Sequence, residues 1–196
     1  MTTAAPTVED FIALSCINVG VGPGGTTNMV ARVALVDYQG HIVFERFVEP
    51  TMAVTDYRTS TTGIAESDLA SNEVLPFAVV QQYVANLIKG KVLVGHSLWN
   101  DLSVLGIPHS AAATRDVALY QPFRNALKMP QQVIGLQTLA WQLMCRRCQE
   151  EQLHPVENAR AALDLYRSQA EEWEDAITKG NWPCALPPST FSRCYL

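Results

Sequence analysis

The chain has 196 residues, 48% hydrophobic and 17% charged, which predicts one globular domain with a sizeable core. Lysine and arginine number 14 and aspartate and glutamate 19, so the net charge of −5 excludes a protein whose whole surface attracts nucleic acid, although not a local basic groove. No apolar run approaches the ~20 residues that span a bilayer, and the first ten residues lack a secretory signal. We therefore expect an intracellular protein that does not bind a membrane.

Three apolar runs rich in β-branched residues come first and predict consecutive strands, at residues 10–19, 29–38 and 41–48. Gln39 and Gly40 separate the second run from the third, which is typical of a β-hairpin. The glycine-rich stretch Gly20–Gly25 predicts a loop after the first strand; it lacks the lysine ending of a phosphate-binding loop. A long connection over 50–65 and one helical turn at 64–69 follow this three-strand meander.

Helices and strands then alternate. Apolar residues at helical spacing predict helices, and short β-branched runs predict strands. In chain order we expect a helix at 76–89, a strand at 91–95, a helix at 98–105, a strand at 115–119, and helices at 136–148 and 156–177. A meander followed by such alternation predicts an α/β fold with a mixed central β-sheet flanked by helices.

The predicted elements divide the chain into an N-terminal extension (1–9), one domain (10–179) and a C-terminal tail (180–196). The tail contains three prolines together with Trp182, Phe191 and Tyr195, so we expect it to pack on the domain or on a partner. The five cysteines are irregularly spaced, which predicts reduced thiols. Cys145 and Cys148 form a C-x-x-C pair without a second pair at zinc-site spacing, so we expect ordinary thiols on a helix.

Four local phrases, taken together and in this order, resemble one known family. They are Phe11–Gly25 (FIALSCINVGVGPGG), Asp56–Ile64 (DYRTSTTGI), Val94–Leu102 (VGHSLWNDL) and His154–Tyr166 (HPVENARAALDLY). The resemblance is to the DEDDh 3′→5′ exonucleases of RNase H-like fold, in particular the RNA exonuclease 4 type, and it extends over nearly the whole chain. It implies an RNase H-like fold and, as an expectation only, a nuclear location.

The resemblance also implies a catalytic site, whose chemistry uses two Mg²⁺ ions held by four carboxylates, with a histidine as the base. At the matching positions this chain has Ser15 for the first aspartate, Ile17 for the glutamate and Asn158 for the last aspartate. Asp101 and His154 match the family. One carboxylate offsets one of four positive charges, and Ile17 would place an apolar side chain where the metals lie. We therefore expect no resident cofactor.

For Asp101 and His154 we favour structural roles over catalytic ones, because the other ligands are lost. Asp101 lies near a predicted helix start, where an acidic residue interacts favourably with the helix dipole, and His154 precedes a proline at another helix start. His96 ends a predicted strand and is expected to be packed and hydrogen-bonded. Arg58 is a weak candidate for a phosphate contact, and a solvated or salt-bridged arginine is at least as good an explanation.

Three hypotheses on function follow. The leading one is a pseudo-exonuclease: an inactive or impaired exonuclease-like protein that acts as a binding or assembly module for a protein partner or for a second copy of itself. The second is binding of single-stranded RNA or DNA without cleavage. The third is residual 3′→5′ exonuclease activity that uses Asp101 and His154 with one Mg²⁺ or Mn²⁺ ion.

Overall fold

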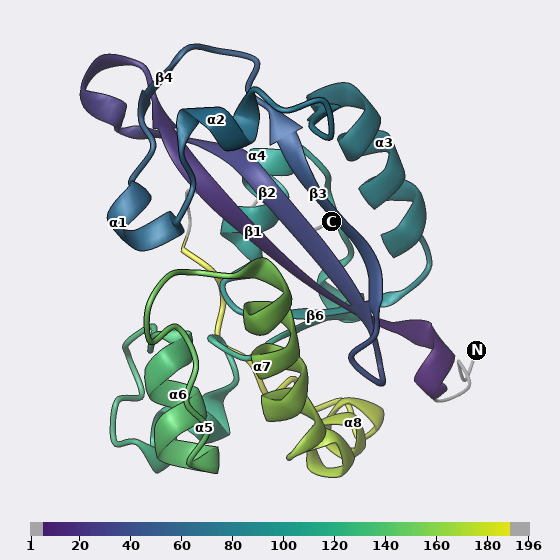
Figure 1. The fold of residues 1–196 in the computed structure, drawn as a ribbon. Helices are drawn as coiled ribbons and strands as arrows, with labels where there is room; N and C mark the ends of the chain where they lie inside the picture. The colour runs from purple at the N-terminus through teal and green to yellow at the C-terminus, as the bar shows by residue number, and fades with distance from the viewer. Residues whose placement is uncertain (1–5, 189–196) are drawn as a thin grey trace.

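Three long antiparallel strands form the centre of the sheet: β1 (Phe11–Val21), β2 (Thr27–Asp37) and β3 (Ile42–Glu49). They belong to a computed structural model that describes residues 6–188 (Figure 1). Two short strands, β6 (Val92–Gly95) and β7 (Thr114–Asp116), continue the sheet parallel to β1. The predicted meander and mixed sheet are therefore confirmed.

The full strand order is β5-β3-β2-β1-β6-β7, with β4 (Val54–Asp56) paired to the end of β1. The two-residue strand β5 (Leu75–Pro76) pairs with the end of β3. Sequence patterns did not indicate β4 or β5, because two or three residues are too short to show a period. A β-bulge between Ile17 and Asn18 shifts the register of β1 against β2, and this lies where the candidate ligands cluster.

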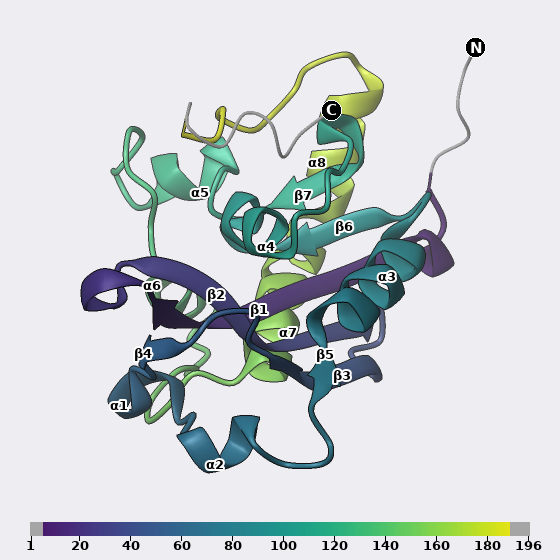
Figure 2. The ribbon, with the colours of Figure 1, turned by 90° about the horizontal axis from the view of Figure 1, so that it is seen from above.

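Helices cover both faces of the sheet, and each face has its own apolar core. On one face, α7 (Pro155–Arg167) and α6 (Leu136–Met144) pack against Ala13 of β1. On the other, α3 (Phe77–Ile88) and α4 (Leu98–Leu105) pack against Leu14 of β1. Successive residues of a strand point to opposite faces, so every residue of β1 except Asn18 is buried. Figure 2 shows α3 lying along β3 and β5.

Two predicted helices differ from the structure. The helix predicted over 136–148 ends at Met144, because Cys145 adopts a left-handed conformation (φ 53°) and its N–H closes the last turn. Cys145 and Cys148 thus follow the helix rather than lying on it. The helix predicted over 156–177 is broken into α7 and α8 (Ala170–Thr178). Three short helices, α1 (Thr59–Thr62), α2 (Glu66–Leu69) and α5 (Gln121–Ala126), complete the fold.

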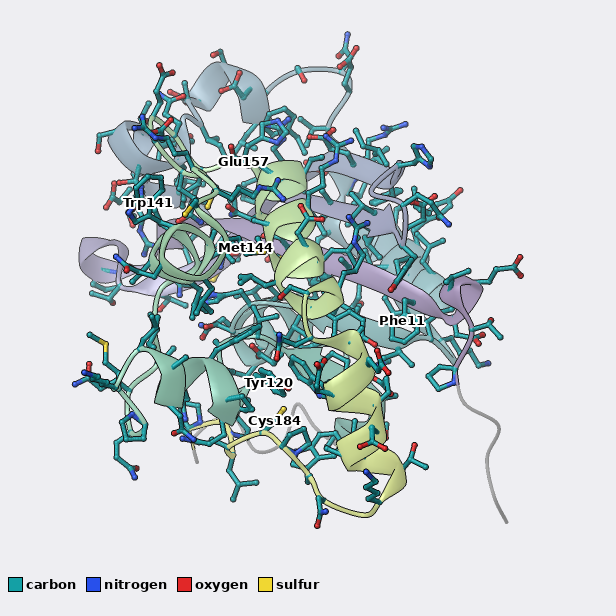
Figure 3. All side chains as sticks on the ribbon, turned by 90° about the horizontal axis from the view of Figure 1, so that it is seen from below. Phe11, Tyr120, Trp141, Met144, Glu157 and Cys184 are labelled. Atoms are coloured by element: carbon teal, nitrogen blue, oxygen red, sulfur yellow. The ribbon has the colours of Figure 1, made fainter. Side chains whose placement is uncertain are left out.

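The described part of the C-terminal tail runs beside the start of α5. The N–H of Gln121 donates to the carbonyl of Pro183 at 2.9 Å, and the N–H of Ala185 donates to the carbonyl of Leu119 at 2.8 Å. Tyr120 and Cys184 form the bridge between these segments (Figure 3). Phe191, Cys194 and Tyr195, which the sequence also assigned to the tail, lie outside the described residues. Among the helices of residues 6–188, none is long and apolar enough to cross a membrane.

Candidate functional site

Three of the five residues at the family's site positions line one polar hollow of about 280 Å³. β1, the first turn of α4, the start of α6, the segment before α7 and α7 itself form its walls. The lining residues are Leu14, Ser15, Cys16, Asn18, His96, Ser97, Asn100, Asp101, Leu136, Gln149 and Asn158. The fold therefore brings Ser15, Asp101 and Asn158 together, as the sequence predicts. Ile17 and His154 are not among the lining residues.

Among residues 6–188, Asp101 is the one carboxylate that lines this hollow. It lies in the first turn of α4 and is 7% exposed. Burial raises the pKa of its carboxyl well above the usual range, and the Asp116 carboxylate raises it further; a hydrogen bond from the backbone of Cys16 acts in the opposite sense. Burial therefore disfavours the charged form of this carboxyl.

A second buried carboxylate, Asp116, stands behind the hollow at the end of β7. Its two oxygens accept hydrogen bonds from the backbone N–H groups of Ser97 (2.9 Å), Leu98 (2.7 Å) and Ala118 (3.0 Å). It thus caps the N-terminus of α4, a role that sequence analysis missed because the two segments lie far apart in the chain. Burial is the main reason why the pKa of Asp116 is raised. Its oxygens are committed to the backbone and do not line the hollow.

Asn158 is held by Gln149, a residue that sequence analysis also missed. The side-chain N–H of Gln149 donates to Oδ1 of Asn158 at 2.8 Å. The backbone N–H of Gln149 donates to Glu157 Oε2 at 2.9 Å, and Gln149 itself has a left-handed backbone (φ 57°). Two amides therefore occupy the α7 side of the hollow. Nothing in the sequence pattern pointed to Gln149, because it lies between the helices expected at 136–148 and 156–177 and outside the four family phrases.

The two substituted positions on β1 have different surroundings in the structure. Ser15 is 9% exposed and lines the hollow. Ile17 is 2% exposed and packs in a separate apolar cluster with Val19, Ala31 and Ile64. Ile17 does not line the hollow, and its side chain contributes to this apolar cluster.

His154 contacts side chains of β2 and β3. Its Nε2 lies 2.9 Å from Nη2 of Arg32 and 3.7 Å from Oε1 of Glu45, and Arg32 in turn binds Glu45 at 2.5 Å. Burial and the Arg32 guanidinium lower the pKa of His154. A neutral imidazole that accepts a hydrogen bond from Arg32 fits this geometry. In this arrangement His154 contributes to a link between β2, β3 and the start of α7.

Arg58 is tied to the glycine-rich loop after β1. Its guanidinium donates to Oδ1 of Asn28 and to the carbonyl of Gly25, each at 2.8 Å. Gly25 needs to be a glycine, because it has a φ of +64° and an added Cβ would lie 2.6 Å from Cβ of Asp56. The geometry thus gives Arg58 a structural task in bracing this loop.

The donor set does not fit the pair of Mg²⁺ ions that the family resemblance implies. Magnesium requires hard oxygen ligands and enough negative charge to offset its own. The hollow offers one carboxyl whose charged form is disfavoured, the Ser15 hydroxyl, and an Asn158 oxygen already bound to Gln149. Among residues 6–188, no group of three or more His, Cys, Asp or Glu side chains is placed to hold a metal ion.

Sequence comparison finds relatives among nucleases. The chain is 38% identical over 176 residues to RNA exonuclease 4 of Mus musculus, which is 90% of this chain and 40% of that protein. It is 40% identical over 163 residues to RNA exonuclease 4 of Homo sapiens (83% and 38%) and 33% identical over 184 residues to the human apoptosis-enhancing nuclease (92% and 56%). No protein-family model matches. The chain thus spans about 40% of the length of the RNA exonuclease 4 relatives.

Solved structures share the fold. The Neurospora crassa Pan2 catalytic unit matches with a TM-score of 0.72 at 22% identity, over 91% of this chain and 30% of that one. The Saccharomyces cerevisiae Pan2 pseudoubiquitin hydrolase–RNA exonuclease module in complex with AAGGAA RNA matches with a TM-score of 0.74 at 25% identity, over 92% and 32%. The fold is therefore the RNase H-like fold of the Pan2 exonuclease domain, and the homologues support an exonuclease-like protein.

Proposed function

We propose that this chain is an exonuclease-like domain that binds single-stranded RNA without hydrolysing it. The observation that carries the proposal is the charge of the hollow. Ser15 and Asn158 are neutral, Ile17 is packed elsewhere, and Asp101 is the one acidic side chain among the described residues that line the hollow. Such a site has too few ligands to hold the two metal ions that this type of catalysis requires.

The replacement of carboxylates by neutral side chains also removes an obstacle to the binding of RNA. A cage of four carboxylates repels a phosphodiester unless cations stand between them. Here the lining includes hydroxyl and amide side chains that can donate hydrogen bonds, among them Ser15, Asn100 and Gln149. RNA is therefore expected to bind without divalent cations. RNA is preferred to DNA because the relatives are named RNA exonuclease 4 and because the matching Pan2 module was solved with RNA.

The test measures binding and cleavage in the same samples. Fluorescently labelled single-stranded RNA and DNA are titrated with the protein at low salt, in EDTA, in Mg²⁺ and in Mn²⁺, and the products are separated afterwards. We expect equal RNA affinity in EDTA and in Mg²⁺, weaker DNA binding, and intact RNA. Absence of RNA binding at low salt overturns the proposal. Trimming from the 3′ end that disappears in Asp101→Ala also overturns it, in favour of residual exonuclease activity.

Restoration variants show whether the hollow still receives a 3′ end. Ser15→Asp with Asn158→Asp returns two carboxylates to residues that line the hollow, and the triple variant adds Ile17→Glu. Trimming by either variant in Mg²⁺, with none by the parent, supports a cleft that kept its substrate and lost its metals. Trimming by the parent at the same rate as the restored variants contradicts the proposal.

A second candidate function, self-association, is favoured by the outward face of α3. Residues 74–88 contain no charged side chain, although Val79 is 39% and Tyr83 55% exposed. The centre of a protein interface is typically poor in charged residues and rich in aromatic ones such as tyrosine. Sedimentation equilibrium over a wide concentration range tests it. We expect a reversible dimer that Tyr83→Glu dissociates; a monomer at every concentration excludes it.

A further inference from the structure

A second hollow, which we call the Trp141 hollow, lies on the outward side of α6. The polar hollow of the candidate site is called the Asp101 hollow. The Trp141 hollow measures about 450 Å³. Its lining comes from α6 and from the segment that follows it: Gln137, Thr138, Trp141, Gln142, Arg146, Arg147, Cys148 and Glu150. Trp141 is 46% exposed, which is unusual for the largest apolar side chain. Figure 3 shows Trp141 on the side of α6 away from α7, whereas Met144 lies between the two helices.

A positive charge stands over the Trp141 ring. The guanidinium carbon of Arg147 lies 5.6 Å from the ring centroid, within the range of a cation–π interaction. The ion-pair partner of Arg147 is Glu150 at 3.3 Å, and both side chains are more than half exposed. Such exposed pairs are weak and exchange readily. The neighbouring Arg146 is instead engaged with Asp164, so Arg147 is the cation that this hollow can offer.

The two hollows share a wall. Leu136 lines the Asp101 hollow, and its neighbour Gln137 lines the Trp141 hollow. In the same way, Gln149 lines the Asp101 hollow and its neighbour Cys148 lines the Trp141 hollow. The side-chain N–H of Gln137 donates to the carbonyl of Gln149 at 3.2 Å across this wall. The two hollows are thus lined by residues that are adjacent in sequence on the same two segments of the chain.

We infer that Trp141 and Arg147 form a stacking platform for one base and one phosphate of single-stranded RNA. The inference rests on the RNA binding proposed above and names where the strand leaves the Asp101 hollow. An exposed aromatic ring beside a weakly paired cation is the combination that single-stranded nucleic-acid binders use, because every base has a π-face and every linkage a negative charge. The side-chain amides of Gln137 and Gln142 lie in the same hollow and can hydrogen-bond to base edges.

Trp182 provides a matched control. It is 42% exposed, and the guanidinium of Arg115 lies 5.9 Å from its ring centroid. Arg115, however, has a side chain that is 4% exposed, and it donates to both carboxylate oxygens of Glu174 at 2.6 and 2.9 Å. That guanidinium is not free to meet a phosphate. Trp182 therefore shares the exposure and the nearby arginine of Trp141 without the available charge.

The experiment measures the affinity for a labelled single-stranded RNA of about ten nucleotides, within the usual site sizes. We expect Trp141→Ala to weaken binding by about 5- to 150-fold, the loss of one base stack, and Trp141→Phe to retain most of the affinity. Trp182→Ala leaves the affinity unchanged. Arg147→Gln lowers the slope of log affinity against log salt by about 0.7, the value for one phosphate contact. Glu150→Gln tightens binding, because it releases Arg147 and removes a negative charge.

Tryptophan fluorescence gives an independent readout: RNA quenches the emission of the parent and of Trp182→Phe, but much less that of Trp141→Phe. If the parent binds RNA and Trp141→Ala binds equally well, the platform is overturned while RNA binding stands. If the parent binds no RNA, the proposed function fails and the platform with it. If Trp141→Ala and Trp182→Ala weaken binding alike, the effect is general and the platform is likewise overturned.

Discussion

Ile17→Glu tests the placement of Ile17 in the core. The side chain is 2% exposed and packs with Val19, Ala31 and Ile64 rather than in the Asp101 hollow. Truncating a buried isoleucine costs about 2–5 kcal/mol, and a buried polar group without a partner costs about 1–3 kcal/mol. Because the chain length of glutamate retains part of the packing, we expect a loss of about 3–5 kcal/mol from a total stability of about 5–15 kcal/mol.

The loss should depend on pH, and its sign follows from burial. Burial disfavours the charged carboxylate, so the pKa of the introduced carboxyl in the folded state lies above its unfolded value of about 4.3. The variant is therefore most stable below about pH 4.3, and its free energy of unfolding falls as the pH rises through the folded pKa of the introduced carboxyl. Urea unfolding followed by tryptophan fluorescence, compared between about pH 5 and about pH 8, measures the effect.

Two controls separate charge from shape. Ile17→Val should cost about 0.5–1.5 kcal/mol and Ile17→Gln should cost more, but neither loss should change with pH. A variant Ile17→Glu that is within about 1 kcal/mol of the parent, at both pH values, would refute the reasoning. An increase in its melting temperature on addition of Mg²⁺ would do the same, because it would show that the new carboxylate reaches the hollow.

Three further predictions concern the polar residues of the site. Burial and Asp116 raise the pKa of Asp101, so its favourable contribution to folding stability is full below about pH 3.9 and is lost as the pH rises through the folded pKa. At about pH 8, Asp101→Asn should therefore unfold at a higher temperature than the parent. A lower unfolding temperature contradicts this. Gln149→Ala removes the 2.8 Å hydrogen bond to Asn158 and should cost about 1 kcal/mol in urea unfolding; an unchanged midpoint argues against that bond. Arg58→Ala should cost about 1–3 kcal/mol without changing RNA affinity, since its donors brace the loop; lost affinity with unchanged stability would instead identify a phosphate contact.

Local patterns were sufficient for most of the fold. The apolar, β-branched runs of β1 to β3 and the apolar stripe of α3 indicated the right elements, and α4 begins and ends where the pattern indicates, at Leu98 and Leu105. The errors lie where a single backbone conformation ends an element. Cys145 is left-handed and ends α6, although nothing but glycine or asparagine commonly signals such a residue.

The candidate site divides in the same way. The sequence by itself determined that Ser15, Ile17 and Asn158 stand where the related family has carboxylates, because residue type and spacing are local properties. Only the tertiary structure decided what replaces the lost ligands, since those contacts join segments far apart in the chain. It brought Gln149 to Asn158, and it turned His154 toward Arg32, 122 residues away in sequence. Such pairings depend on how β-strands and helices stack, and burial then sets the charge of the Asp101 carboxyl left between them.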